Sequence, residues 1–330
     1  MKINPEYVRE HLPDIVNEET GMKWITRSAQ ESDTIVIETK YDGECCFIEK
    51  RDGKILVSNK GKTTYDTDFF QSRNHDDFYT EMLEAFTLDG IYMAELIAGD
   101  GNVNQFNLYQ SAIADGSKGK LRAKVYDIIE LENQDISNAE LSKRRKLLKK
   151  VVSENSSVQL VDSWKLDSNK SIKERLTIMQ ETFDVITKED NMEGMIIKFP
   201  NKWIKKKVTN TVDAVVIGIK KTKEWEENHI ARSFLLGLKN GESYHIIGCL
   251  SSGFTHEQLE NDMPIETISK WTSISNPDSI RSDDYIPVNP SIVLECKYLS
   301  FGEKLRQPRL VRIRTDKTPD TCNMNQIRGL

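Results

Sequence analysis

Short apolar runs separated by turn residues dominate the first two thirds of the chain. Runs rich in Val, Ile and aromatic residues predict strands over 33–40, 45–49, 54–58, 90–98, 124–131 and 193–199. Asp52-Gly53, between the second and third of these runs, is a hairpin signal. Apolar residues at helical spacing predict helices over 75–87, 137–154 and 171–187, with Ser137 or Asn138 as N-cap of the second. Residues 1–30 are expected to form a helix or two followed by a loop.

Beyond about residue 208 the pattern changes to short strands joined by turns such as Asn240-Gly241. The strand candidates are 212–219, 233–238, 244–250 and 292–300. Strands at this spacing predict a small β-barrel. The polar stretch 255–290 is expected to form a helix and a long loop, and its pattern does not assign bounds to either. The 330 residues suit two domains. We expect an α+β domain of antiparallel sheets with helices over 1–207, followed by a β-barrel domain over 208–330.

Composition excludes collagen-like, disordered and membrane-spanning classes, because 38% of the residues are hydrophobic and 30% are charged. Five scattered cysteines without a C-x-x-C pair suggest a reducing cytosol. The acid-rich N-terminus has no signal-peptide pattern. The net charge of −6 argues against a purely electrostatic DNA binder.

The charge is nevertheless uneven, with cations gathered in 143–150, 202–223 and 304–317. Such clusters can bind phosphates even when the whole chain is acidic. For 143–150 we favour a solvated helix face over DNA contact. For the other two segments we favour phosphate contact.

Lys40 stands at the end of a predicted strand, directly before a tight turn at Asp42-Gly43. If other cations surround it, its pKa falls and its free amine becomes a nucleophile. The alternative, on this pattern alone, is a solvated surface lysine beside a turn.

Downstream of Lys40, five residues have the chemistry of a nucleotide site. Tyr126 offers a stacking face for a base, and Glu95 offers an acceptor for a ribose hydroxyl. Glu193 offers an oxygen ligand for Mg²⁺. Lys205 and Lys207 lie two apart, so on a strand they face the same way and can hold phosphate oxygens.

The ordered set of motifs resembles the covalent nucleotidyltransferases, and among them most closely the ATP-dependent DNA ligases in their compact viral or phage-like form. The motifs are KYDG (40–43), AEL (94–96), VYD (125–127), EGMIIK (193–198) and WIKKK (203–207). The second domain adds DAVVIGI, RSFLLGLKNGESYHIIGCLSSGFT and the basic LRQPRLVRIRTDK (305–317). The resemblance therefore implies an adenylation domain followed by an OB-fold domain.

The resemblance also implies a role for each matching residue. Lys40 would become adenylated, Glu95 would contact the ribose, and Tyr126 would stack on adenine. Glu193 would help bind the metal, and Lys205 and Lys207 would contact the α-phosphate. In the terminal motif, Arg306, Arg309, Asp316 and Lys317 would orient the pyrophosphate. The DNA contacts expected are Lys60, Lys206, Lys220 and Arg309.

Substrates and setting follow from the same resemblance. We expect ATP, Mg²⁺ and nicked duplex DNA as ligands, a monomer, no membrane association, and the cytoplasm of a bacterium or of a virus- or phage-infected cell. Only about 30 residues precede the first predicted strand, so we expect no separate N-terminal DNA-binding domain.

Two positions depart from the family pattern. K-x-D-G-x-R has Cys45 in place of its arginine. The next motif, usually Ser-Arg, is best matched by Ser58-Asn59-Lys60, with Lys60 as the substitute cation; the other candidate is Ser72-Arg73-Asn74.

Three other functions remain open: an RNA ligase, an mRNA guanylyltransferase, and a non-catalytic OB-type nucleic-acid binder. The NAD-dependent ligases are disfavoured because their zinc-binding cysteines are missing.

Overall fold

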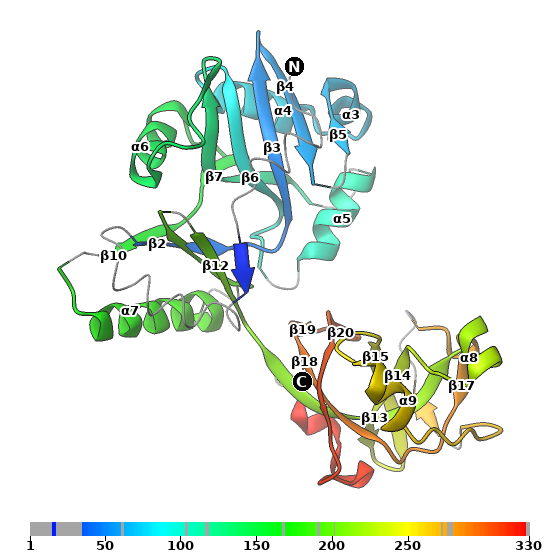
Figure 1. The fold of residues 1–330 in the computed structure, drawn as a ribbon. Coiled ribbons are helices and arrows are strands. Elements are labelled where there is room, and N and C mark those ends of the chain that lie inside the picture. Colours follow the sequence, from blue (N-terminus) through cyan, green and yellow to red (C-terminus); the bar gives the residue numbers. More distant parts are fainter. Residues whose placement is uncertain are drawn as a thin grey trace. The chain divides into compact units, whose positions relative to one another are not determined.

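The computed structural model describes residues 15–17, 35–60, 63–102, 105–115, 119–166, 169–189, 192–200, 202–271, 273–275 and 280–327 (Figure 1). The chain divides into two units, Met1–Val208 and Thr209–Leu330. Within the described residues, no helix has the length and apolar character that crossing a membrane requires.

The first sheet of the first unit has the order β1-β12-β11-β2-β10. Its strands are β1 (Ile15–Asn17), β2 (Ile35–Lys40), β10 (Ser163–Leu166), β11 (Gly194–Phe199) and β12 (Lys202–Lys207). All neighbours are antiparallel except β1 and β12. A helix or two followed by a loop is expected over residues 1–30; for residues 15–17 this is wrong, because they pair as a strand with β12. The remainder of 1–34 lies outside the described residues.

Helix α7 (Ile172–Asp184) and the π-helical turn that follows it (Val185–Glu189) pack against one face of this sheet. Met179 and Ile186 share a core with Ile35 and Ile37 of β2. Because side chains alternate along a strand, Glu38 and Lys40 face the other side, away from α7.

The second sheet of this unit has the order β5-β4-β3-β6-β7-β8, with β9 paired in parallel to β7. Its strands are β3 (Glu44–Arg51), β4 (Lys54–Asn59), β5 (Thr64–Tyr65), β6 (Gly90–Ala98), β7 (Leu121–Leu131), β8 (Gln134–Asp135) and β9 (Val158–Leu160). The helices beside it are α3 (Thr67–Ser72), α4 (Asp76–Ala85), α5 (Phe106–Asp115) and α6 (Leu141–Val151). Apolar residues of all four helices share one core with the sheet, so the helices cover one face and leave the other to the cavity described below.

Two glycines hold the chain at the points where Lys40 and Glu193 stand. Gly43 lies in the link between β2 and β3, where a Cβ would sit 2.1 Å from the carbonyl oxygen of Leu96. Gly194 has a φ of +153°, and its Cβ would sit 2.1 Å from the carbonyl oxygen of Lys206. Only glycine tolerates such close approaches, so this backbone requires glycine at positions 43 and 194, close to Lys40 and Glu193.

The second unit is built on the sheet β16-β15-β14-β13-β18-β21, with β17 paired to β13 and a separate ribbon of β19 and β20. The strands are β13 (Asn210–Lys220), β14 (Phe234–Asn240), β15 (Ser243–Leu250), β16 (Ile274–Ser275), β17 (Tyr285–Pro287), β18 (Val293–Tyr298), β19 (Ser300–Phe301), β20 (Leu305–Arg306) and β21 (Arg309–Ile313). Two short helices accompany them, α8 (Lys223–Asn228) and α9 (His256–Asn261). The stretch 255–290 therefore contains α9, β16 and β17 as well as loop.

The α6 helix begins later than its sequence pattern predicts. Its N-cap is Glu140, not Ser137 or Asn138. Arg144 explains the difference, because its guanidinium donates to the backbone carbonyls of Ser137 (3.1 Å) and Ala139 (2.5 Å) and holds them in the turn before the helix.

Candidate nucleotide-binding site

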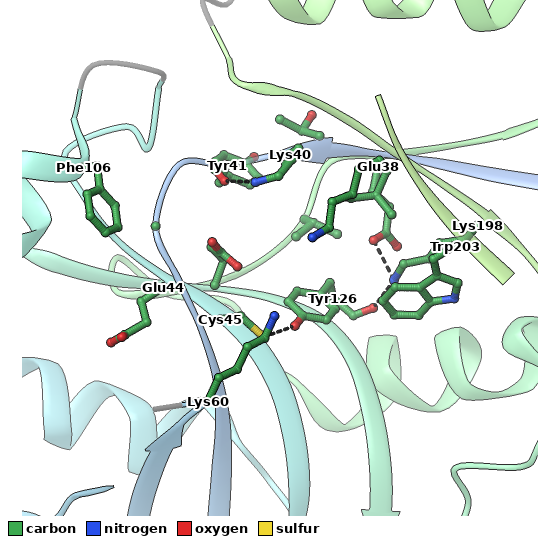
Figure 2. Close-up of a pocket in the computed structure, with 16 residues that line it drawn as sticks. Glu38, Lys40, Tyr41, Glu44, Cys45, Lys60, Phe106, Tyr126, Lys198 and Trp203 are labelled. Atoms are coloured by element: carbon green, nitrogen blue, oxygen red, sulfur yellow. Dashed lines mark hydrogen bonds and ion pairs between the residues drawn. The ribbon is translucent and has the colours of Figure 1, made fainter. Parts of the chain in front are cut away.

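A cavity of about 300 Å³ opens between the two sheets of the first unit (Figure 2). Residues of β2, β11 and β12 line it from one side, and residues of β3, β6 and β7 from the other. Lys40, Glu95, Tyr126 and Lys205, which lie far apart in the sequence, all reach this cavity.

Lys40 and Glu193 form an ion pair, in which the Lys40 Nζ donates to one carboxylate oxygen. Lys207 pairs with the other oxygen of Glu193. The side chains of Lys40 and Glu193 are only 15% and 3% exposed, so the pair is shielded from water. The carboxylate thus links the proposed nucleophile to one of the proposed phosphate lysines.

Carboxylates, not cations, dominate the charge around Lys40. Burial lowers the pKa of Lys40, but the charges of Glu193, Glu95 and Asp42 outweigh burial and raise it above its ordinary value. Burial opposes ionisation of Glu193, yet Lys40 and Lys207 bring its pKa below the ordinary value. Without nucleotide, Lys40 is therefore an ammonium and Glu193 a carboxylate.

Lysines from both sheets also line the cavity. Burial, followed by the charges of Lys60, Lys40 and Lys207, lowers the pKa of Lys205. Mutual repulsion of this kind is relieved when an anion binds among the cations. The arrangement suits a polyphosphate.

Glu95, on β6, lies close to these lysines. Burial raises the pKa of Glu95 to about 7; the charge of Lys40 lowers this pKa, and the charge of Glu193 raises it further. A half-buried carboxyl in this setting can accept a hydrogen bond from a sugar hydroxyl when it is ionised.

Aromatic rings form another wall. The Tyr126 hydroxyl lies 3.0 Å from the Cys45 Sγ, and its ring meets Trp203 edge to face, with centroids 6.0 Å apart. The Lys198 Nζ stands 3.7 Å from the centroid of the Trp203 ring. Phe106 also lines the cavity (Figure 2). The wall can take a flat aromatic base.

Glu38 and Lys198 are cavity residues that the sequence analysis did not assign. The Glu38 carboxylate is 2.7 Å from the Lys198 Nζ, and its other oxygen pairs with Arg145 of α6. Two signals could have revealed them. Glu38 lies two residues before Lys40 on the same strand, and Lys198 is the one charged residue in the apolar run GMIIKF.

Glu193 fits a magnesium ion only if other ligands come from the nucleotide. Among the described residues, no group of three or more His, Cys, Asp or Glu side chains could hold a metal ion. Mg²⁺ commonly uses one or two carboxylates, substrate phosphates and water. Glu193, which pairs with the cavity residue Lys40 and with Lys207, could contribute one ligand to such a shared site.

Two lysines assigned to DNA from the sequence lie in different places. Lys60, at the end of β4, lines the cavity. Lys206 lies on the α7 side of the first sheet, 3.1 Å from Gln180 and 4.7 Å from the centroid of the Phe183 ring. The other motif candidate, Arg73, caps the end of α3 over Phe69 and does not line the cavity.

In the second unit, Lys317 and Arg314 both pair with Asp213 of β13. Arg314 also donates to Asp316, from Nε at 2.7 Å and from Nη2 at 2.8 Å. In the sequence, Arg314 is only one of a run of cations, whereas in the structure it is the centre of this cluster. Arg306 lies on the separate β19–β20 ribbon, and Lys220 and Arg309 are exposed.

The architecture is that of a nucleotidyltransferase unit followed by an OB-fold unit, as predicted. Two family models match the chain: "ATP dependent DNA ligase domain" over residues 17–210 and "ATP dependent DNA ligase C terminal region" over 227–317. The chain belongs to the ATP-dependent DNA ligase family, which confirms the resemblance found in the sequence.

Individual relatives agree with this membership. The DNA ligase of Methanococcus aeolicus is 28% identical over 319 residues, which cover 87% of this chain and 52% of the relative. The DNA ligase of Haloarcula marismortui is 24% identical, over 91% of this chain and 55% of the relative. The chain thus spans about half the length of these relatives. The solved structure Pmar-Lig_PreS3 shares the fold, with a TM-score of 0.64 and 17% identity, over 92% of this chain and 67% of that one.

Proposed function

We propose that this chain is an ATP-dependent DNA ligase that seals nicks in duplex DNA through a lysyl-AMP intermediate. Residues 1–207 would be the adenylation domain and residues 208–330 the OB domain. The observation that carries the proposal is the single cavity that joins Lys40, Glu95, Tyr126 and Lys205, with Glu193 paired to Lys40 at its wall.

In the first step, the lone pair of the Lys40 Nζ attacks the α-phosphorus of ATP. The ammonium loses one proton to water before the attack, which frees the lone pair, and a second as the new N–P bond forms and the bond to the pyrophosphate oxygen breaks; the third stays on the phosphoramidate nitrogen. Because Lys40 is an ammonium in the ion pair, it must first leave Glu193. Mg²⁺, when bound at Glu193, would neutralise phosphate charge.

The other residues hold the substrate during this step. Lys205 and Lys207 neutralise the α-phosphate, Glu95 accepts from the ribose, and Tyr126 stacks on adenine. Arg306 and Lys317 orient the pyrophosphate. Such catalysis consists mostly of positioning and charge neutralisation.

The adenylate then passes to DNA. The 5′-phosphate of the nick attacks the AMP phosphorus and displaces the Lys40 nitrogen, which takes up a proton. The 3′-hydroxyl next attacks the 5′-phosphorus, loses its proton and expels AMP. Lys60, Lys206, Lys220 and Arg309 are the proposed DNA contacts.

We also propose a monomer in the cytoplasm of a bacterium or of an infected cell. The five cysteines are free thiols, which is consistent with a reducing compartment.

The test is sealing of a nicked duplex with ATP and Mg²⁺. The wild-type protein should seal DNA nicks, prefer ATP over GTP, and lose activity with Lys40→Ala. Chelation with EDTA should stop the reaction without changing the unfolding midpoint. Efficient sealing of RNA nicks alone would favour an RNA ligase. DNA binding without any sealing or adduct, by folded protein free of AMP, would favour the OB-type binder.

A further inference from the structure

Lys60, Cys45 and Glu95 form a row across three neighbouring strands on the cavity face of the second sheet. Cys45 of β3 pairs with Glu95 of β6. On the other side of β3, Cys46 pairs with Asn59 of β4. Because the two strands are antiparallel, the next position in the register places Lys60 beside Cys45. Directly opposite residues of antiparallel strands lie on the same face, with Cβ atoms about 5 Å apart. All three residues of the row line the cavity, and Figure 2 shows Lys60 reaching toward Cys45 and Tyr126.

The charge of Lys60 acts on residues of both sheets that line the cavity. Burial and Glu95 raise the pKa of Cys45, and Lys60 opposes them. The same lysine works against the burial that raises the pKa of Glu95, and it adds to the burial that lowers the pKa of Lys205. Lys60 therefore lies within electrostatic reach of both the proposed ribose acceptor and a proposed phosphate lysine.

Asn59 cannot supply a cavity contact of this kind. It lies opposite Cys46, whose side chain belongs to the core under the helices. Its Nδ2 donates to Glu44 at 2.9 Å, and its Oδ1 accepts from the backbone N–H of Thr63 at 2.9 Å. Glu44 also accepts from the hydroxyl of Tyr109 on α5 at 2.5 Å. Asn59 thus ties the sheet to α5, and Lys60 is the cation of this segment that faces the cavity.

We propose that Lys60 grips the α-phosphate of ATP while the Lys40 adduct forms, and so replaces, from the neighbouring strand, the arginine that the ligase motif carries at position 45. This inference rests on the proposed function. The small thiol of Cys45 leaves room for the long Lys60 side chain beside it. Two cations at directly opposite positions would repel each other, so with Lys60 in place a further cation at position 45 would add repulsion as well as charge.

The test is the rate of adduct formation with α-labelled ATP and Mg²⁺ in the absence of DNA, over a range of ATP concentrations. Lys60→Ala should raise the KM for ATP about tenfold, the size expected for loss of one charge-assisted contact. Lys60→Arg should keep most of the activity. Lys54→Ala, at the exposed opposite end of the same strand, is the matched control and should behave as wild type.

The decisive protein is the double variant Cys45→Arg/Lys60→Ala, the exchange variant, which moves the cation from position 60 to position 45. It should return the KM for ATP to within about threefold of wild type, whereas Cys45→Arg alone should bring no gain. Thermal melts identify any variant that fails to fold, and Lys60→Gln then replaces Lys60→Ala.

Two results would overturn the inference. The first is normal adduct formation by Lys60→Ala with loss only of nick sealing, which would make Lys60 a DNA contact alone. The second is a folded exchange variant no better than Lys60→Ala. Absence of adduct in the wild-type protein is a different result, because it overturns the proposed function itself and this inference with it.

Discussion

Lys40 is held by the same carboxylate that pairs with Lys207. The pairing keeps the amine protonated until the ion pair opens, since Glu193 and Glu95 raise the Lys40 pKa against the effect of burial. A nucleotide with its metal offers Glu193 and the lysines new partners of opposite charge. In the proposed mechanism, substrate binding would therefore also release Lys40 from its ion pair.

Glu95 makes the stability of the protein depend on pH. Its pKa in the folded protein is about 7, above the ordinary 4.5, because the carboxyl is buried. Its contribution to stability is therefore complete below pH 4.5 and is lost as the pH rises through 7. For a half-buried group we expect about 2 kcal/mol less free energy of unfolding at pH 8 than at pH 5.

Urea unfolding of wild type and Glu95→Gln at both pH values measures this contribution. The amide does not titrate, so the difference between the two proteins should itself change by about 2 kcal/mol between the two pH values. A difference that stays constant across this range would contradict the assignment of the titration to Glu95.

At the scale of elements, α6 is fastened to β7 directly beside Tyr126, the proposed base-stacking residue. Arg144 of α6 makes a bidentate pair with Asp127, Nε to Oδ1 and Nη2 to Oδ2, both at 2.9 Å. The Asp127 side chain is 3% exposed, and it follows Tyr126 in the chain. This pair therefore helps to set the strand position from which Tyr126 enters the cavity.

Arg144→Met should lower the free energy of unfolding by about 3 kcal/mol, because it leaves a buried carboxylate without its partner. The KM for ATP should rise as Tyr126 loses its fixed position. Adding Asp127→Asn should recover part of the stability, since the buried charge is then gone. Denaturant titrations of the three proteins check this. A loss below about 1 kcal/mol for Arg144→Met would show that the pair is dispensable.

The sequence predicts the elements whose pattern is local and misses those that depend on partners. Gly90–Ala98 is found with the predicted bounds because its apolar run is buried on both faces. Ile15–Asn17 is a strand only through pairing with β12, which no local pattern reveals. The motif residues of the cavity could be named from the sequence. Two features of the cavity could not, because they depend on strand register and long-range packing: the ion pair of Glu38 with Arg145, and the position of Lys60 beside Cys45.

At the scale of the whole molecule, the net charge of −6 is a poor guide to DNA contact, because it averages over segments of opposite sign. Lys220 and Arg309 of the second unit are both exposed and belong to its basic segments. If they contact DNA phosphates, they contribute to affinity through counterion release, which makes binding weaken with salt.

Lys220→Ala and Arg309→Ala should each weaken binding to nicked duplex DNA and reduce the slope of log affinity against log salt by about 1. Lys188→Ala is the control, because this exposed lysine lies outside the basic segments and pairs with Asp184. Binding titrations at several salt concentrations measure the slope. A slope unchanged from wild type in either variant would remove that residue from the DNA contacts.

The proposed mechanism depends on Lys40 as the carrier of the adenylate. The direct measurement is mass spectrometry of peptides from protein incubated with ATP and Mg²⁺ and freed of unbound nucleotide. We predict one AMP attached through a phosphoramidate to Lys40, and no adduct in folded Lys40→Ala. An adduct on another residue, or one that persists in Lys40→Ala, would contradict the account.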